Sequence, residues 1–315
     1  MKKIVFSLAI ASMFFVAGCA QNKANNKVKK DITKKEIPAK PAHVNASDEE
    51  IQKNIGNSVN KDYSVKETDN TKQALGVLAE TGNVLKYIDK GKDKKAKQEL
   101  AKLIGELEIM LTKDPDLALI PVGVAYETND VTTDLETVQK ITLAAKKAMD
   151  DGYYQVAKNL MNDLSSELII KTSYLPMATY PDAMRLSAAL LDEGKKEEAV
   201  ALLAKSLNTM VIEEQHMPLP VLKAEEFIKM GAATMQKDDK DKKEVAMLFL
   251  DNADYQLQLA QAMGYGKKDK EYKELADAIQ TLKQSIKDDK ESKSGFEKLS
   301  KKIKEFKERL FFKKK

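Results

Sequence analysis

The stretches MDDGYYQVAKNLM (Met149–Met161) and LDEGKKEEAVALL (Leu191–Leu203) repeat one pattern at an offset of 42 residues. Each has an acidic pair, a glycine, four residues, an alanine and then a spaced apolar row. Glycine readily takes the left-handed backbone that ends many helices, and a small alanine lets a second helix pack closely on the first. The unit therefore predicts a helical hairpin.

Two further copies extend the pattern in both directions. An earlier copy is IDKGKDKKAKQELAKLIGEL (Ile88–Leu107), with Gly91 and Ala96 at the key places, and a degenerate copy is DKKEVAMLFL (Asp241–Leu250). A hairpin cannot bury its apolar face alone, so repeated hairpins are expected to stack and share a core. The pattern resembles a tetratricopeptide repeat with a longer period.

The extra length of each repeat lies in the connectors DLALIPVGVAY, ELIIKTSYLPMATYP and TMVIEEQHMPLP. Each connector is apolar and partly β-branched before it reaches a proline, which cannot continue a helix. We expect extended connectors packed on the helices, with short β pairing among them as an alternative. The predicted fold is all-α: tetratricopeptide-like helical hairpin repeats with short extended connectors, plus a C-terminal amphipathic helical extension.

The N-terminus reads as a lipoprotein signal peptide over residues 1–18. MKK precedes a short apolar run that ends in VAGC, and Cys19 is the single cysteine of the chain. The run is too short for a membrane-spanning helix, and small residues before a cysteine resemble a bacterial lipobox. We expect Cys19 to be the lipid attachment site, so that acyl chains hold the protein in a membrane. Ala20 favours the outer membrane, with the body facing the periplasm of a diderm host.

Residues 19–66 are rich in Lys, Asn, Asp and Ser, and they predict a disordered tether. A short helix near Ser47–Ile55 is an alternative, because Ser47 and Glu50 have the spacing of a capping box. The repeat domain is expected over residues 67–265. A basic amphipathic helical tail is expected over residues 266–315.

The tail differs from the body in charge. It has 17 basic and 10 acidic residues from Lys267 onward, whereas residues 19–266 have 34 basic and 39 acidic residues. Two amphipathic stretches separated by SKSG predict either a helical hairpin or a coiled coil with another subunit, and hence a possible homo-oligomer. The terminal FFKKK has the composition of a lipid contact, with a frayed, solvated helix end as the alternative. The nearly balanced total charge does not favour nucleic acid.

Several motifs together resemble the YfdX family of bacterial exported proteins. They are ALIPV (Ala118–Val122), YLPMATYP (Tyr174–Pro181), DEGKKEEA (Asp192–Ala199) and MPLPVLKAEEF (Met217–Phe227). The resemblance covers roughly residues 70 to 235. It implies a mostly helical periplasmic protein associated with envelope stress, including acid and heat tolerance. It implies no catalytic residues, and it includes neither the lipobox nor the basic tail.

The residues offer little catalytic chemistry. His216 lies in EEQHMPLP among ligand types for copper or zinc, but a single histidine is a weak basis for a metal site. We expect no metal, no cofactor and no enzymatic activity. Tyr174, Tyr180 and His216, with Tyr153 and Tyr154, are candidates for a groove that holds a hydrophobic ligand or an unfolded chain, with core packing as the alternative.

The sequence favours a membrane-anchored, non-enzymatic protein that binds partner or client proteins under envelope stress. Its alternatives are a self-assembling scaffold and a small-ligand or metal-binding enzyme that uses the proline-rich connectors.

Overall fold

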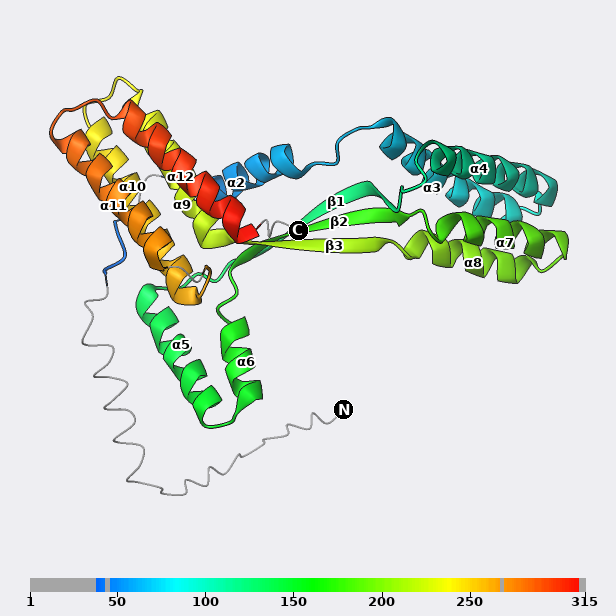
Figure 1. Cartoon of the computed structure of the whole chain (residues 1–315), viewed down its shortest axis with the longest axis horizontal. Helices are drawn as coiled ribbons and strands as arrows, with labels where there is room; N and C mark the ends of the chain where they lie inside the picture. Colours follow the sequence, from blue (N-terminus) through cyan, green and yellow to red (C-terminus); the bar gives the residue numbers. More distant parts are fainter. Residues whose placement is uncertain (1–37, 43–45, 267–268, 312–315) are drawn as a thin grey trace, which may run out of the picture.

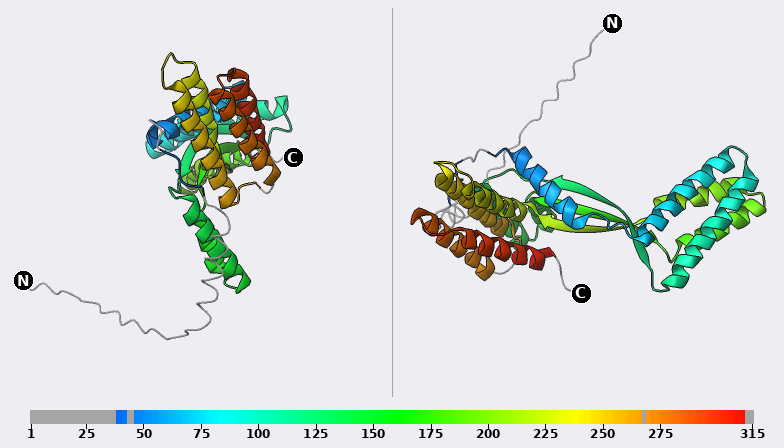
Figure 2. Two further views of the ribbon diagram at one scale, coloured as in Figure 1. Left: turned by 90° about the vertical axis from the view of Figure 1, so that its left-hand side faces the viewer. Right: turned by 90° about the horizontal axis from the view of Figure 1, so that it is seen from above.

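The computed structural model describes residues 38–42, 46–266 and 269–311. The expected signal peptide, Cys19 and the terminal lysines of FFKKK lie outside the described residues. Two helical lobes are joined by a three-stranded antiparallel sheet, and a helical hairpin projects to one side (Figure 1). Figure 2 shows the sheet spanning the space between the lobes.

Four groups of elements make up this architecture. The distal lobe contains α3 (Asp69–Asp89), α4 (Asp93–Lys113), α7 (Tyr180–Asp192) and α8 (Lys196–Asn208). The sheet contains β1 (Leu119–Asn129), β2 (Glu167–Pro176) and β3 (Val211–Pro218). The side hairpin contains α5 (Leu135–Asp150) and α6 (Tyr154–Asn162). The base lobe contains α2 (Asp48–Tyr63), α9 (Leu219–Met235), α10 (Lys242–Met263), α11 (Asp269–Lys287) and α12 (Lys293–Phe311).

The repeated glycines end the first helix of each hairpin, as the sequence predicts. Gly91, Gly152 and Gly194 have φ angles of +66°, +81° and +77°. The residue after each glycine donates its N–H back to the helix, for example Lys195 N to Leu190 O at 2.8 Å. A left-handed residue followed by this bond is a Schellman C-cap, which satisfies carbonyls at the helix end.

The expected stack of tetratricopeptide-like repeats is not confirmed. The connectors form full strands of 11, 10 and 8 residues in the order β1-β2-β3, each antiparallel to its neighbour. Because each strand reverses the direction of the chain, consecutive hairpins lie at opposite ends of the sheet. The first and third hairpins therefore meet in the distal lobe, whereas the second lies beside the base lobe (Figure 1).

The repeating unit is accordingly two helices and one strand. The β-branched apolar residues of the connectors favour paired strands because they pack well on a pleated surface. Pairing also supplies hydrogen-bond partners for the backbone N–H and C=O groups, which an unpaired extended connector would leave unsatisfied. The fold is mostly helical with a small sheet, and this broader part of the predicted fold class is confirmed.

Part of the segment that was expected to be a disordered tether is an ordered helix. Residues Asp48–Tyr63 form α2, which begins at Ser47, whose side chain accepts from Glu50 N. Ile51, Ile55 and Val59 are buried in the base-lobe core, at the i, i+4 and i+8 spacing of one helix face. The segment is polar apart from these three apolar residues. Their burial against α9 offsets the loss of conformational entropy when α2 becomes ordered.

The C-terminal tail is part of the core rather than a separate domain. The helices α11 and α12 form a hairpin that packs on α10 and α9, so of the two sequence alternatives the structure shows the hairpin. Their apolar stripes are buried, including Leu275, Ile279, Phe296 and Ile303. A side chain at Gly231 of α9 would approach the Phe296 ring to 3.2 Å, so the two helices pack closely there.

None of the helices in the described ranges is both long enough and apolar enough to cross a membrane.

We expect Gly194→Ala to lower the free energy of unfolding by about 1 kcal/mol, because an alanine at φ +77° is strained. Gly56→Ala is the matched control. It lies inside α2 with nothing within 4 Å of the added carbon, so it should raise the free energy of unfolding by about 0.5 kcal/mol. Urea unfolding followed by circular dichroism measures both. Equal effects of the two substitutions would contradict the C-cap assignment.

A buried ion pair between α12 and α9 makes the stability of the docked tail depend on pH. Lys307 Nζ of α12 lies 2.6 Å from Glu225 Oε2 of α9, with both side chains about nine-tenths buried. Burial raises the pKa of Glu225, but Lys307 and Lys229 outweigh it, and the net pKa lies below the usual value. This stabilisation is present above the unfolded pKa of about 4.3 and is lost as the pH falls through the folded pKa.

We therefore expect Lys307→Met to cost about 2 kcal/mol of unfolding free energy at pH 7. The difference from the unsubstituted chain should shrink as the pH falls below the unfolded pKa of about 4.3 and acid protonates Glu225, whose folded pKa is lowered. Urea titrations at a series of pH values test this. Lys298→Met, on the same helix, is the control, and a deficit independent of pH would contradict the assignment.

Candidate binding site at the base of the sheet

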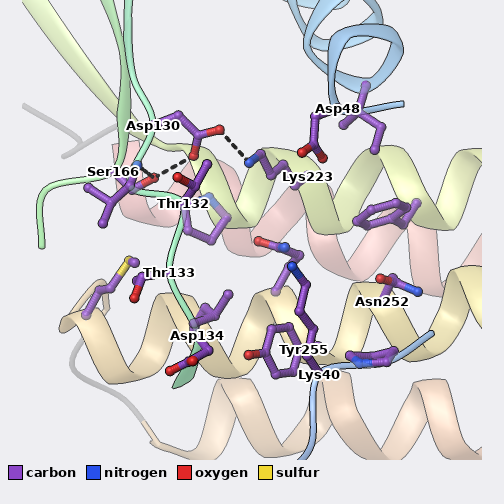
Figure 3. A pocket seen from close by; sticks show the side chains of 18 of the residues that line it. Lys40, Asp48, Asp130, Thr132, Thr133, Asp134, Ser166, Lys223, Asn252 and Tyr255 are labelled. Carbon is purple, nitrogen blue, oxygen red and sulfur yellow. Dashed lines mark hydrogen bonds and ion pairs between the residues drawn. The ribbon is translucent and has the colours of Figure 1, made fainter. Parts of the chain in front are cut away.

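A cavity of about 430 Å³ lies where the sheet meets the base lobe (Figure 3). Its lining comes from the segment before α2 and the start of α2, from the loop between β1 and α5, from the residue before β2, from the start of α9 and from α10. The residues that carry its polar groups are Lys40, Asp48, Asp130, Thr132, Thr133, Asp134, Ser166, Lys223, Asn252, Tyr255 and Gln256. Segments far apart in the sequence therefore converge on one cleft.

The loop from Asp130 to Asp134 is held at both ends. Asp134 caps α5 by accepting from Thr137 N at 2.7 Å, and these bonds lower the pKa of its carboxyl. The next residue, Leu135, donates its N–H to the buried Tyr255 Oη of α10 at 3.0 Å. The first turn of α5 is thus fixed to α10, which keeps the wall of the cleft in place.

A largely buried ion pair lies where the sheet meets the cleft. Lys223 Nζ of α9 lies 2.7 Å from Asp130 Oδ2, and the two side chains are 11% and 13% exposed. Asp130 also accepts from Gln52 of α2 at 3.2 Å and from the Ser166 hydroxyl at 3.4 Å. One carboxylate therefore links the sheet to α9 and α2.

A second set of hydrogen bonds continues from Ser166 to the sheet. Tyr265 Oη accepts from Ser166 N at 2.9 Å and lies 3.2 Å from both Ser166 O and Glu167 Oε1. Burial and the neighbouring Glu167 raise the pKa of Tyr265 to about 12, so its phenol keeps its proton. Glu167 Oε2 lies 2.6 Å from His216 Nδ1. The network thus runs from Lys223 to His216.

One face of the sheet beyond His216 is charged and open to solvent. Lys171 Nζ of the central strand lies 2.6 Å from Glu127 of β1 and 3.5 Å from Glu214 of β3. The paired carboxylates hold the pKa of Lys171 above its ordinary value through hydrogen bonding and charge. Such exposed cross-strand pairs contribute modestly to stability and mainly fix strand register.

Three of the five residues predicted to line a groove, Tyr174, Tyr180 and His216, lie in different places. Tyr180 is 2% exposed in the distal-lobe core, where its hydroxyl donates to Thr81 Oγ1 at 2.9 Å, so it reaches no groove. Tyr174 lines a second cleft, of about 440 Å³, between the sheet and the connector from α2 to α3. His216 pairs with Ile169 across the sheet, five residues along β2 from Tyr174. The structure brings none of these three together.

Sequence reasoning missed the residues that shape the first cleft. Lys223 is the one charged residue in LPVLKA at the start of α9, and a lone lysine in an apolar run is a signal for a buried partner. No local pattern points to Asp130, 93 residues earlier in the chain. Cys19, the predicted lipid site, lies outside the described residues.

The cleft presents hydroxyl, amide and charged groups around an apolar floor that includes Phe227 and Leu259. Its Lys223 and Asp130 satisfy each other, so the site does not present a free cation or anion at the position of this pair. Within the part of the chain that the structure describes, no group of three histidine, cysteine, aspartate or glutamate side chains is arranged to hold a metal ion. The arrangement suits a small polar molecule or a peptide segment bound by hydrogen bonds and apolar contact.

Helical hairpins alternating with the strands of a small antiparallel sheet define the class of fold. Residues 77–216, from α3 to β3, match the family described as YfdX protein. The chain therefore carries a YfdX region, which confirms the resemblance for the motifs ALIPV, YLPMATYP and DEGKKEEA, whereas MPLPVLKAEEF lies beyond the matched residues. The base-lobe helices and Lys223 lie outside the matched residues.

A solved crystal structure of YfdX from Salmonella Typhi is similar to this chain, with 17% sequence identity. The match covers 47% of this chain and 91% of that one, with a TM-score of 0.32. No curated protein matches the chain.

We expect Lys223→Met to lower the free energy of unfolding by about 3 kcal/mol, because it leaves the Asp130 carboxylate buried without its cation. Adding Asp130→Asn should recover most of that loss, since an amide carries no charge to bury. Urea unfolding of the single and double variants measures both effects. A double variant as unstable as Lys223→Met alone would show that lost packing, not charge, is responsible.

Proposed function

We propose that this protein is a non-enzymatic binding module of the cell envelope, held to a membrane through lipid on Cys19. In this proposal the body faces the periplasm and binds extended segments of partner or stress-damaged client proteins. The lipobox-like VAGC supports the anchor, and the YfdX region supports a role in envelope stress by analogy with its family. The observation that carries the binding role is the open edge of strand β3.

Strand β3 pairs with β2 on one side, and no described strand pairs with its other side. Val211 and Ile212 on this strand are 42% and 58% exposed. Natural edge strands are usually protected by lysine, proline, a bulge or a covering element, because free backbone groups recruit another strand. Here the first half of β3 combines free backbone groups with two β-branched apolar side chains.

An extended client segment could add to β3 as a fourth strand. Backbone hydrogen bonds would supply affinity for any sequence, and Val211 and Ile212 would contact apolar client residues. Glu213 and Glu214 on the same strand would favour segments that carry lysine or arginine. Such binding tolerates many sequences, which suits a protein that protects varied clients.

A second candidate function is binding of a small polar ligand in the cleft beside Lys223, favoured by its volume and hydroxyl-rich lining. An enzyme built on the connectors has less support, because His216 is exposed and contacts only carboxylates among its hydrogen-bonding partners. The two binding proposals differ in their residues. Changes on β3 would leave a ligand in the cleft unaffected, since β3 contributes no residue to its lining.

We expect the protein to suppress aggregation of heat-denatured citrate synthase, measured by light scattering, and Ile212→Lys to lose about half or more of that effect. A lysine on an edge strand disfavours strand addition. Leu186→Lys on α7 is the matched control, because Leu186 is 54% exposed but lies away from the sheet. The control should behave as the unsubstituted chain. No suppression by the unsubstituted chain, or equal loss in both variants, would refute client binding at β3.

A further inference from the structure

The side hairpin leaves an apolar surface uncovered. Figure 1 shows α5 and α6 projecting away from both lobes, and α6 packs on α5. Of the apolar side chains in α6, only that of Ala157 is fully buried. Five large apolar side chains between the end of α5 and the end of α6 are 41% to 69% exposed, namely Met149, Tyr153, Tyr154, Val156 and Met161.

The repeat shows that the same positions are covered elsewhere in the molecule. Met149 occupies the place of Ile88 in the first hairpin and Leu191 in the third. It is 54% exposed, whereas those two residues are 6% and 5% exposed. Met161 is 41% exposed, whereas its equivalents Leu100 and Leu203 are both 0% exposed. The side hairpin thus carries the contact residues of a hairpin pair, and no hairpin among the residues that the structure describes covers them.

The partner in the distal lobe is another hairpin, related by a pseudo-two-fold axis. The second helix of the first hairpin, α4, packs on the first helix of the third, α7, and α3 packs reciprocally on α8. Asp93 and Lys196 hold the same position of the repeat, and their charged groups lie 2.5 Å apart. Contact between equivalent positions places them at the axis.

We propose that the side hairpin pairs with the side hairpin of a second copy of this chain. The pair would repeat the distal-lobe arrangement about a true two-fold axis, with α5 of each copy on α6 of the other. Tyr154, which holds the position of Asp93 and Lys196, would meet Tyr154 of the second copy at the axis. An interface of this kind is isologous and closes as a dimer.

Charge complementarity supports a second copy as the occupant. In the distal lobe, Lys97 of the first hairpin pairs with Asp192 of the third at 2.6 Å. The equivalents of these residues in the side hairpin are Lys158 and Asp150. One side hairpin therefore carries both members of the pair, and two-fold pairing would form the contact twice.

Apolar residues replace charged ones at the tip of the side hairpin. Tyr153 stands where the first and third hairpins have Lys92 and Lys195, and Val156 stands where they have Lys95 and Glu198. The charged equivalents stay exposed in the paired distal lobe, so Tyr153 and Val156 extend the apolar surface of the side hairpin beyond the positions that are covered there. This surface lies apart from the β3 edge, so the dimer does not depend on client binding.

The first test is disulfide trapping in the full chain carrying Cys19→Ser, which removes the only native thiol. Tyr154→Cys in that background should form a disulfide-linked dimer on mild oxidation, because equivalent positions meet at the axis. Ile109→Cys is the matched control, since Ile109 is 55% exposed on α4 outside the proposed interface. Absence of the linked dimer, or equal linking of the control, would overturn the two-fold pairing.

The second test uses sedimentation equilibrium on the same Cys19→Ser background without added cysteines. We expect a species of twice the 35.2 kDa chain mass. Met161→Glu should weaken the dimer roughly tenfold or more, whereas Ile109→Glu should leave it unchanged. Asp150→Lys and Lys158→Asp should each weaken it about fivefold, and the double exchange should restore it.

A monomer at all concentrations, or a dimer insensitive to Met161→Glu, would overturn the proposal. So would a double exchange that leaves the dimer as weak as the single changes. Circular dichroism melting of each variant verifies that the helices stay folded, which is expected because Met161 and Tyr154 are exposed in the single chain. Aggregation suppression measured on the same proteins reports separately on client binding.

Discussion

Antiparallel pairing of three strands organises the whole molecule. Each strand returns the chain to the opposite end of the sheet, so hairpins made from one repeated sequence pattern cannot stack on their nearest neighbours in sequence. The first and third meet at the distal end and bury each other's tips, with Asp93 against Lys196 at their pseudo-two-fold axis. The second is left at the base with its tip uncovered. One constraint on strand direction thus accounts for the two lobes and for the exposed surface of the side hairpin.

The base lobe closes the other end of the sheet with elements from both ends of the chain. Helix α2 precedes the YfdX region and α9 to α12 follow it, yet they share one core with Leu168 and Ile170 of β2. The Lys223–Asp130 pair couples this lobe to the sheet, and the Lys307–Glu225 pair couples the tail to α9. Both pairs are largely buried, so each charge depends on its partner to offset desolvation. The helical tail therefore belongs to the same folding unit as the repeats, and the unpaired edge of β3 lies between two lobes.

Local patterns predicted the elements well where one segment carries its own signal. The glycine C-caps, the hairpins, the stripes of α11 and α12 and the capping box at Ser47 all follow from residues within about two turns of each other. The candidate site was less predictable, because Asp130, Ser166, Lys223 and Tyr265 come from separate segments without a shared motif. Tyr180 reads locally like a groove tyrosine, but its partner Thr81 is 99 residues away and places it in a core. Burial depends on which segments meet, and periodicity carries no information on that.

The sequence by itself determined the repeated hairpins, the family resemblance and the extended character of the proline-terminated connectors, because turn chemistry and apolar spacing act over short distances. Only the tertiary structure decided that the connectors pair as one antiparallel sheet, that alternate hairpins become partners, and that Met149 and Met161 stay exposed while their repeat equivalents are buried. Strand pairing is a non-local choice. Its free energy comes from backbone groups and side chains distant in sequence, so three nearly equivalent hairpins acquire different surroundings from the direction in which the strands run.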